Sequence, residues 1–413
     1  MAAQDTENNT FAQSRRSSLI AAIFLMATSA IGPGFITQTA TFTAMMGAAF
    51  AFGILASIVI DYVVQQNVWR VITTTRMRAS DVANAALPGS GYVLSVLVIL
   101  GGLAFNIGNI AGAGLGLNAL LGLEPKWGGL ISAAVAIYIF SSRRASTTVD
   151  RIMVLLGLMM IVLTFYVTVM SNPPVGEALR QSILPDEINF ASITTIVGGT
   201  VGGYITYAGA HRLLDKGMVG VEHIKEVSAA ATKGILVVGL MRFILFLAVL
   251  GVVASGVTLD ISSQVANPAS QAFQHATGSI GVRIFGLIFW AAALTSVIGA
   301  AYTSISFVTV FKQSMTERQR NLATIVFIVV SLVVYLSLGT TPASILVFVG
   351  GFNGLILPVG LSIFVYVGWK RADLMEGYHY PRWLLWLGLI TCALTWYMGA
   401  MSFSAIFNFL KVV

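Results

Sequence analysis

Charged side chains are scarce in this chain, and cysteine and histidine are scarcer still. Only 9% of its 413 residues are charged and 57% are hydrophobic, whereas a soluble domain carries about 25% charged residues. The low charge excludes an ordinary soluble protein and predicts an all-α polytopic membrane protein. The single cysteine, Cys392, lies in an apolar run, which excludes a disulfide framework and a redox motif.

Several kinds of active site are also missing. The sequence has no Gly-x-x-x-x-Gly-Lys-[Ser/Thr] loop, which argues against ATP-driven transport. No His, Cys or acidic cluster has the spacing of a nucleophile or a metal site, so a membrane-embedded enzyme lacks support. The net charge of +7 does not indicate nucleic acid, because basic residues collect in cytoplasmic loops of membrane proteins. We expect no cofactor, a lipid bilayer and a small-molecule substrate as partners, and a monomer.

Long apolar runs provide the positive signal. At about 20 apolar residues per span, the sequence predicts eleven transmembrane helices, at 18–43, 46–69, 91–121, 127–141, 151–171, 190–214, 233–256, 282–311, 321–339, 343–369 and 383–410. Residues 1–17 form a polar tail, 18–382 a transport core, and 383–413 the last helix with the C-terminus.

The distribution of Lys and Arg predicts the orientation. If the N-terminus is cytoplasmic, the cytoplasmic loops receive 18 of the 23 Lys and Arg residues, and the outer loops are acidic. Because basic residues favour the cytoplasmic side, we predict a plasma (inner) membrane protein with a cytoplasmic N-terminus and an extracytoplasmic C-terminus.

Two of the predicted helices contain sequences that should interrupt them. Gly32-Pro33-Gly34 lies in the 18–43 helix, where the proline removes a backbone donor and each glycine weakens the helix by about 1 kcal/mol. The 190–214 helix carries four glycines in the six residues Gly198–Gly203. Within lipid, such breaks persist only where protein or a cavity surrounds them.

The two interrupted helices open two successive sets of five. Helices 1–5 (about 18–171) and 6–10 (about 190–369) can therefore form an inverted repeat, since five is odd. Interrupted helices at corresponding repeat positions indicate a midplane binding site in a secondary transporter. The alternative is that the glycines only allow close helix packing.

A break leaves helix ends that carry partial charges. We expect the amide ends near Ile36–Thr39 and Tyr204–Tyr207, where they would suit a carboxylate, and the carbonyl ends near Thr28–Gly32 and Val197–Gly199, where they would suit a cation. The candidate substrate-binding residues are Gly32, Gly34, Phe35, Thr37, Gln38, Thr39, Gly199, Gly202, Gly203, Tyr204, Tyr207 and Asn353. For each polar residue, hydrogen bonding between helices is the competing interpretation.

Several motifs resemble the NRAMP family of proton-coupled divalent-metal transporters. They are Gln65-Gln66-Asn67, Arg78–Ala83, the Thr/Ser-containing segment Leu294–Tyr302, and Phe352–Pro358 with an amide before a proline. The resemblance implies the leucine-transporter (LeuT-type) fold with discontinuous helices 1 and 6.

The chain departs from that family at the metal site. The family has Asp-Pro-Gly-Asn in helix 1, where the resemblance places Gly32 and Phe35 here, and Met-Pro-His in helix 6, where it places Gly202 and Tyr204. Soft-metal sites need imidazole, thiolate, thioether or carboxylate ligands, and neither break carries an acidic residue. We therefore predict a small organic solute, carboxylate-bearing or amino-acid-like, and no metal site. The alternative is a proton-coupled divalent-metal transporter with an atypical site.

The coupling ion is left open between sodium and a proton. Thr295 and Ser296 could place hydroxyls opposite backbone carbonyls near Ala27–Ala30, as a sodium ion would require. Asp61, well inside a span, and His211 are proton candidates, with Arg242 as a possible counter-charge. Structural hydrogen bonds and a structural ion pair are the competing interpretations.

Overall fold

The computed structural model describes residues 19, 30–141, 159–261, 267–312, 314–338 and 341–409, and the described part is helical with no strand. The predicted tail 1–17, most of the first half of the 18–43 helix, and the start of the 151–171 helix lie outside these residues. The all-α prediction is confirmed.

The predicted helices follow one another in the predicted order, and two short helices at Ala79–Ala86 and Val175–Ile183 were not predicted. The helices are α2 (Pro33–Met46), α3 (Phe50–Thr75), α4 (Ala79–Ala86), α5 (Ser90–Leu121), α6 (Pro125–Ser141), Met159–Met170, α8 (Val175–Ile183), α9 (Phe190–Val201), α10 (Ile205–Asp215), α11 (Ile224–Ala254), α12 (Pro268–Ser306), α13 (Glu317–Ser337), α14 (Pro342–Lys370) and α15 (Arg382–Asn408). Short 3₁₀ turns lie at Gly47–Ala49, Val221–His223, Val308–Val310 and Ala372–Met375 (η1 to η4).

Seven helices of the described residues are long and apolar enough to cross a membrane. An eighth candidate joins Met159–Met170 to α8 across a bend of 106°. Eleven spans remain a prediction, because α9 and α10 are separate short helices, α6 has 17 residues, and Pro33–Thr75 forms one run through η1.

Some helices begin earlier than the hydropathy predicts. α11 starts at Ile224 rather than 233, and α12 at Pro268 rather than 282. Asn267 caps α12 by accepting a hydrogen bond from the Ser270 amide at 3.1 Å, and Pro268 occupies the first turn. Gly278, with φ of +68°, kinks this early part. The early part of α12 is too polar for hydropathy to predict, and the capping residues allow it to form a helix.

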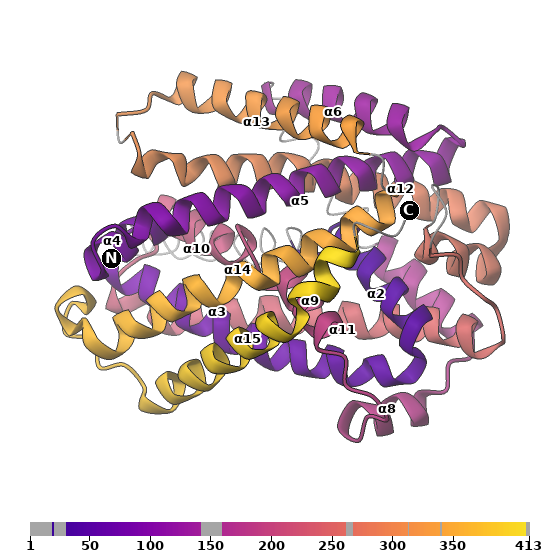
Figure 1. Ribbon diagram of the computed structural model, residues 1–413, viewed down its shortest axis with the longest axis horizontal. Helices are drawn as coiled ribbons and strands as arrows, with labels where there is room; N and C mark the ends of the chain where they lie inside the picture. The colour runs from indigo at the N-terminus through magenta and orange to yellow at the C-terminus, as the bar shows by residue number, and fades with distance from the viewer. Residues whose placement is uncertain are drawn as a thin grey trace, which may run out of the picture.

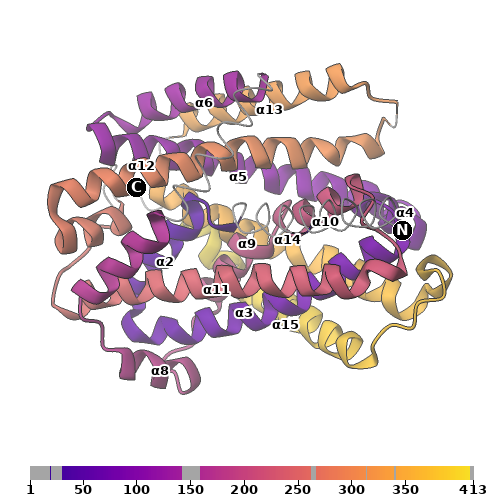
Figure 2. The same cartoon turned by 180° about the vertical axis from the view of Figure 1, so that it is seen from behind.

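The long helices run side by side in a bundle (Figure 1). α6 and α13 lie along one edge, outside α5 and α12, in both views (Figures 1 and 2). α11 packs along α3 on the opposite side, and α14 packs against α5 and α9. The broken segments α2, α9 and α10 lie between these two groups of helices.

One end of the bundle gathers basic residues, and we call it the basic end. α4 and η4 lie there, at the left of Figure 1. Arg76 contacts Glu376 at 3.1 Å and Glu222 at 3.7 Å, and Arg78 contacts Asp215 at 2.5 Å. The loops that carry Arg76, Glu222 and Glu376 were predicted to lie on one side of the membrane from their charge, and they do meet at one end of the bundle. That this side is cytoplasmic stays a prediction.

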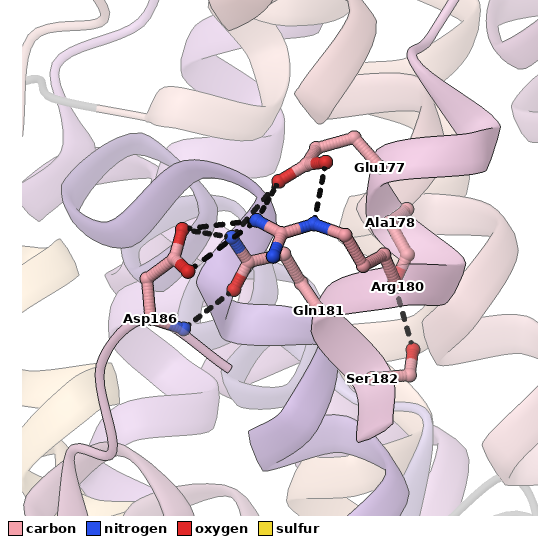
Figure 3. A network of polar contacts seen from close by, with 6 residues as sticks. All are labelled: Glu177, Ala178, Arg180, Gln181, Ser182 and Asp186. Carbon is pink, nitrogen blue, oxygen red and sulfur yellow. Dashed lines mark hydrogen bonds and ion pairs between the residues drawn. The ribbon is translucent and has the colours of Figure 1, made fainter. Parts of the chain in front are cut away.

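The opposite end carries the acidic residues of α8 and the loop that follows it. Arg180 bridges Glu177 at 2.8 Å and Asp186 at 3.2 Å (Figure 3). Hydrogen bonds from Arg180, and then from Gln181, lower the pKa of the Glu177 carboxyl from 4.5 to about 2. Because the pKa is lowered on folding, the network favours the folded loop above pH 4.5 and loses this effect as the pH falls towards 2.

Small residues let α5 and α12 approach closely. A Cβ added at Gly116 would lie 2.6 Å from the Trp290 amide nitrogen, and one at Gly286 would lie 2.6 Å from that of Leu120. In lipid, such backbone proximity replaces the hydrophobic driving force that is absent between helices. α12 is thereby fixed on α5, next to the broken helices.

Gly286→Ala should lower the thermal unfolding temperature in detergent, because the new methyl group meets only backbone atoms, and overpacking costs about 1–3 kcal/mol. Gly299→Ala, in the same helix, is the control, since nothing lies within 4 Å of its added Cβ. Equal unfolding temperatures for the two variants would contradict the close crossing.

Candidate functional site

The first break lies between Ala30 and α2. Gly32 is extended (φ −98°, ψ −174°) and precedes Pro33, the first residue of α2. The first backbone bond across this end runs from the Ile36 amide to the Gly32 carbonyl at 3.3 Å. Within the described part of the chain, the amides left without a bond at this end are those of Gly34 and Phe35. Our prediction of an amide end at Ile36–Thr39 was wrong by one turn, because Pro33 starts the helix instead of interrupting it.

The second break lies between α9 and α10. Gly202 is extended (φ −81°, ψ 162°) and Gly203 has a φ of +54°, in the left-handed region that favours glycine. The Thr206 hydroxyl donates to the Val201 carbonyl, and Trp69 Nε1 donates to the Thr206 carbonyl at 3.0 Å. The predicted interruption of the 190–214 helix is therefore present, and its backbone is partly satisfied.

A small cavity lies at the amide end of α2. It has room for about one water molecule. Its lining comes from both broken helices, α5 and α14, and consists of Ala30, Gly32, Gly34, Phe35, Phe105, Asn109, Gly199, Leu346 and Val349. Four of the twelve predicted substrate-binding residues, Gly32, Gly34, Phe35 and Gly199, line it. At this size the cavity is closed to a larger solute.

Two polar side chains face Gly32. A Cβ on Gly32 would lie 3.0 Å from Ser296 Oγ and 3.8 Å from Asn109 Oδ1. Ser296 Oγ and Asn109 Nδ2 are buried without a hydrogen-bond partner. The other predicted hydroxyl, on Thr295, instead donates to the Ala292 carbonyl of its own helix at 3.0 Å. The structure thus places Ser296 at the break, whereas Thr295 only makes a hydrogen bond within its own helix.

Gln38 lies directly behind the cavity wall. Its Nε2 donates to the Leu346 carbonyl at 2.9 Å, and its Oε1 is buried without a partner. A Cβ on Gly199 would collide with that oxygen. The hydroxyl of neighbouring Thr39 is occupied by the Phe35 carbonyl at 2.7 Å, whereas that of Thr37 is buried and unpartnered.

Asn353 and Tyr204 hold the second break against α5. Asn353 Nδ2 donates to the carbonyls of Gly101 at 3.1 Å and Val349 at 2.9 Å, while its Oδ1 faces Gly203 without a partner. Tyr204 contacts the side chain of Asn109 and stands edge-on to Phe105 at 5.4 Å between ring centroids.

Tyr207 and His211 lie farther along α10, towards the basic end. Both rings pack on Phe307, at 5.2 and 5.3 Å between centroids. His211 Nε2 accepts a hydrogen bond from the Ala79 amide at 3.1 Å, at the start of α4. Since this nitrogen must be unprotonated to accept, His211 holds α10 to α4 as a neutral imidazole.

Asp61 stands on the other side of the broken helices. It contacts Thr200, next to the second break, and interacts electrostatically with Arg242 of α11. The Arg242 guanidinium in turn covers the ring of Phe35 at 4.2 Å. Asp61 and Arg242, the possible counter-charge in the sequence, therefore both contact Thr200.

Among the residues that the structure describes, no three His, Cys, Asp or Glu side chains come together as a metal site would require. The cavity itself offers one amide side chain, one serine hydroxyl nearby, and backbone groups. Its donor set is neutral.

The comparisons with known proteins identify the family. The family model described as natural resistance-associated macrophage protein-like (Nramp) matches residues 23–404. The chain belongs to the Nramp family. It is 50% identical to the uncharacterized membrane protein YcsG of Bacillus subtilis (strain 168) over 383 residues, covering 93% of each chain. It is also 50% identical over 374 residues to an uncharacterized membrane protein of Haemophilus influenzae, covering 91% of this chain and 92% of that protein.

Solved structures show the same fold. A manganese transporter of Eremococcus coleocola matches with a TM-score of 0.72 at 13% identity, covering 94% of this chain and 86% of that one. MhsT in complex with L-phenylalanine matches with a TM-score of 0.62 at 16% identity, covering 92% and 98%. The predicted LeuT-type fold is thus confirmed, and this Nramp chain shares its fold with a manganese transporter and with a protein solved in complex with L-phenylalanine.

Sequence reasoning missed part of the cavity. Phe105, Leu346 and Val349 come from helices whose apolar residues look alike in sequence, so hydropathy offers no signal for them. Asn109 did carry a signal, because a buried amide in a membrane helix needs a partner. Its neighbour Asn106 donates to Ser331 Oγ at 3.2 Å and serves helix packing.

The basic end closes this Nramp chain below the cavity through Arg78–Asp215 and His211–Ala79. Arg78→Ala should loosen this contact and speed thiol labelling of Ala210→Cys, a buried position on α10, in a Cys392→Ser background. Stability should fall by no more than about 1 kcal/mol, because the Asp215 side chain is 41% exposed. Arg180→Ala, at the opposite end, is the control. Equal labelling rates in the two variants would refute a closure at the basic end.

Proposed function

We propose that this chain is a secondary active transporter of a small organic solute that bears a carboxylate, and that it works by alternating access around α2, α9 and α10. The membrane-transporter part follows from the Nramp family. The carboxylate is supported above all by the amide end of α2. Gly34 and Phe35, whose amides make no bond within the described residues, line a cavity whose described lining includes no acidic residue.

Charge argues in the same direction. A helix N-terminus carries partial positive charge and favours an anion. A dication would lose its hydration among neutral groups, which is costly without charged ligands. At Gly32, where the resemblance expects an aspartate, there is no side chain, and Ser296 and Asn109 occupy the neighbouring space. These groups suit a polar organic solute that needs hydrogen bonds.

The closed cavity fits alternating access. A solute larger than water enters only if the broken helices separate from α5 and α14. Gly199, Gly202 and Gly203 make the α9–α10 junction the segment able to change its backbone angles. MhsT, which shares the fold, was solved with L-phenylalanine, and this favours an amino-acid-like solute.

A divalent metal ion is the second candidate. The Eremococcus coleocola protein of the same fold is a manganese transporter, and this chain's family membership supports the same cargo. A hard cation that keeps part of its water shell could use carbonyl, hydroxyl and amide oxygens. Ser296 and Asn109 would then be ligands instead of hydrogen-bonding partners of an organic solute.

A thermal-shift series tests the site. L-alanine, L-glutamate, L-lactate and succinate are each added to the purified protein, since a ligand of the folded state raises the unfolding temperature. Gln38→Ala should bind the best carboxylate about tenfold more weakly, because the cavity wall beside Gly34 and Gly199 loses its support. The rise in unfolding temperature that this carboxylate causes should be correspondingly smaller. Thr39→Val is the control, since its hydroxyl bonds its own helix. Equal shifts in wild type and Gln38→Ala would place the site elsewhere.

Manganese uptake separates the two candidates. Proteoliposomes of the wild-type chain should take up no Mn²⁺ above empty liposomes, because none of the described residues that line the cavity carries a carboxylate or a thioether. Replacing Gly32→Asp and Gly202→Met together should add metal ligands at the two breaks and raise Mn²⁺ binding. Saturable Mn²⁺ uptake by the wild type above that of empty liposomes would reject the organic-solute function.

A further inference from the structure

A second polar cluster lies behind the two breaks, on the side away from the cavity. Its members come from α3, α9 and α11, and all are buried, with 2% or less of each residue exposed. They are Asp61, Gln65, Thr200 and Arg242. Residues 61, 65 and 69 share one face of α3. Because Asp61 contacts Thr200 and Trp69 bonds to Thr206, Gln65 stands level with the turn between α9 and α10.

The cluster is unusually poor in partners for a buried charged site. Asp61 Oδ1, both amide atoms of Gln65, and Nε and Nη2 of Arg242 make no hydrogen bond. Buried polar groups in a packed structure are normally satisfied, and ionisable residues within a membrane mark functional positions. Packing alone does not account for this arrangement.

Arg242 connects the cluster to the cavity. Its guanidinium lies 4.2 Å from the ring centroid of Phe35, and that ring lines the cavity. Its Nη1 donates to Thr200 Oγ1 at 2.8 Å and to the Ile196 carbonyl at 3.1 Å, next to Gly199 on the same helix. A change in the charge balance of this cluster therefore acts on Phe35 at the first break and on Thr200 at the second.

Asp61 is the counter-charge of Arg242 among the described residues around it. α2 and α9 carry no titratable residue. The titratable groups on the other helices packed against α3 engage elsewhere: Tyr204 with Asn109, Tyr207 with Phe307, His211 with Ala79, Arg78 with Asp215, Glu177 with Arg180, Cys392 with Ser362, and Tyr397 with Phe190. The others stand towards the basic end: Asp81, Arg212, Lys225, Glu226, Lys233, Tyr366, Lys370 and Arg382.

Thr200 allows two hydrogen-bond patterns. Its hydroxyl has one proton, which it gives to the Ile196 carbonyl at 2.7 Å or to an ionised Asp61. Once Asp61 carries a proton, it can donate to the Thr200 oxygen, which then accepts from Asp61 and Arg242 and still donates to Ile196. The cluster therefore accommodates both states of Asp61, but only the ionised state balances the charge of Arg242.

We propose that Asp61 and Arg242 are the proton-coupling pair of this transporter, with Arg242 the cationic partner of the solute carboxylate. When a proton from solution binds the Asp61 carboxylate, Arg242 is left with an unbalanced charge behind Phe35. A carboxylate in the cavity supplies the missing negative charge across the ring, so proton and solute bind together. The inference rests on the proposed carboxylate solute.

Thermal unfolding of the full-length protein in detergent tests the pair without any solute. Asp61→Asn and Arg242→Gln should each lower the unfolding temperature, because each leaves one buried charge alone. The double variant should unfold at a higher temperature than either single variant. Effects that simply add would overturn the pair. If a single variant does not fold, folding of the double variant supports the pair. If neither single variant nor the double variant folds, Asp61→Glu and Arg242→Lys are tested next. These two keep the charges and must fold if the pair is held by charge.

Uptake into proteoliposomes tests the coupling. The probe is whichever of L-alanine, L-glutamate, L-lactate and succinate stabilises the wild type most. In the wild type, an inward proton gradient should drive accumulation of the probe. Asp61→Asn should exchange internal for external probe but lose accumulation by the gradient, and Asp81→Asn, outside the pair, should behave as the wild type. Arg242→Gln should lose binding, and Arg242→Lys should restore it in part.

The two ideas fail in different ways. Full gradient-driven accumulation in Asp61→Asn overturns the coupling pair while leaving the carboxylate transporter in place. A wild type that takes up none of the four carboxylates contradicts the proposed function and, with it, the role of Arg242 towards the solute. The unfolding cycle is independent of that result and decides whether Asp61 and Arg242 interact at all.

Discussion

A helix that breaks inside a membrane must find partners for its free backbone groups within the protein, because lipid offers none. The rest of this structure depends on that constraint. α5, α12 and α14 surround the two breaks, and glycines at their crossings allow the backbones to approach. Asn353, Gln38 and Trp69 reach carbonyls on neighbouring segments. The amides of Gly34 and Phe35 are left facing a cavity, and this is what makes the closed core a candidate binding site.

Much of the fold was accessible from the sequence, because hydropathy and the Gly/Pro breaks act locally. The order of the helices, the interruptions at Gly32 and Gly202, and the meeting of the basic loops around Arg76 and Arg78 were predicted. The start of α12 was not, because its first turns are polar and depend on a cap at Asn267. The amide end of α2 was misplaced, because Pro33 can either interrupt a helix or begin one.

The site was harder to predict, since its members come together only in three dimensions. Gly32 and Ser296 are far apart in sequence, yet a Cβ added to Gly32 would lie 3.0 Å from Ser296 Oγ. Asp61 and Arg242 were recognised as unusual, but their pairing depends on how α3 and α11 pack around α9. Family membership adds the fold and the transporter class. It leaves the cargo to be argued from side chains, and the resemblance places departures from the family pattern at Gly32, Phe35, Gly202 and Tyr204.

The central claim is that the amide end of α2 receives a carboxylate. A structure determined with the best-stabilising carboxylate and Mn²⁺ present together tests it most directly, because both candidates then compete for one cavity. The account predicts the carboxylate oxygens within hydrogen-bond distance of the Gly34 and Phe35 amides, with Arg242 still covering the far face of Phe35. A manganese ion held between Ser296, Asn109 and the carbonyls of the first break, with no carboxylate bound, would contradict it.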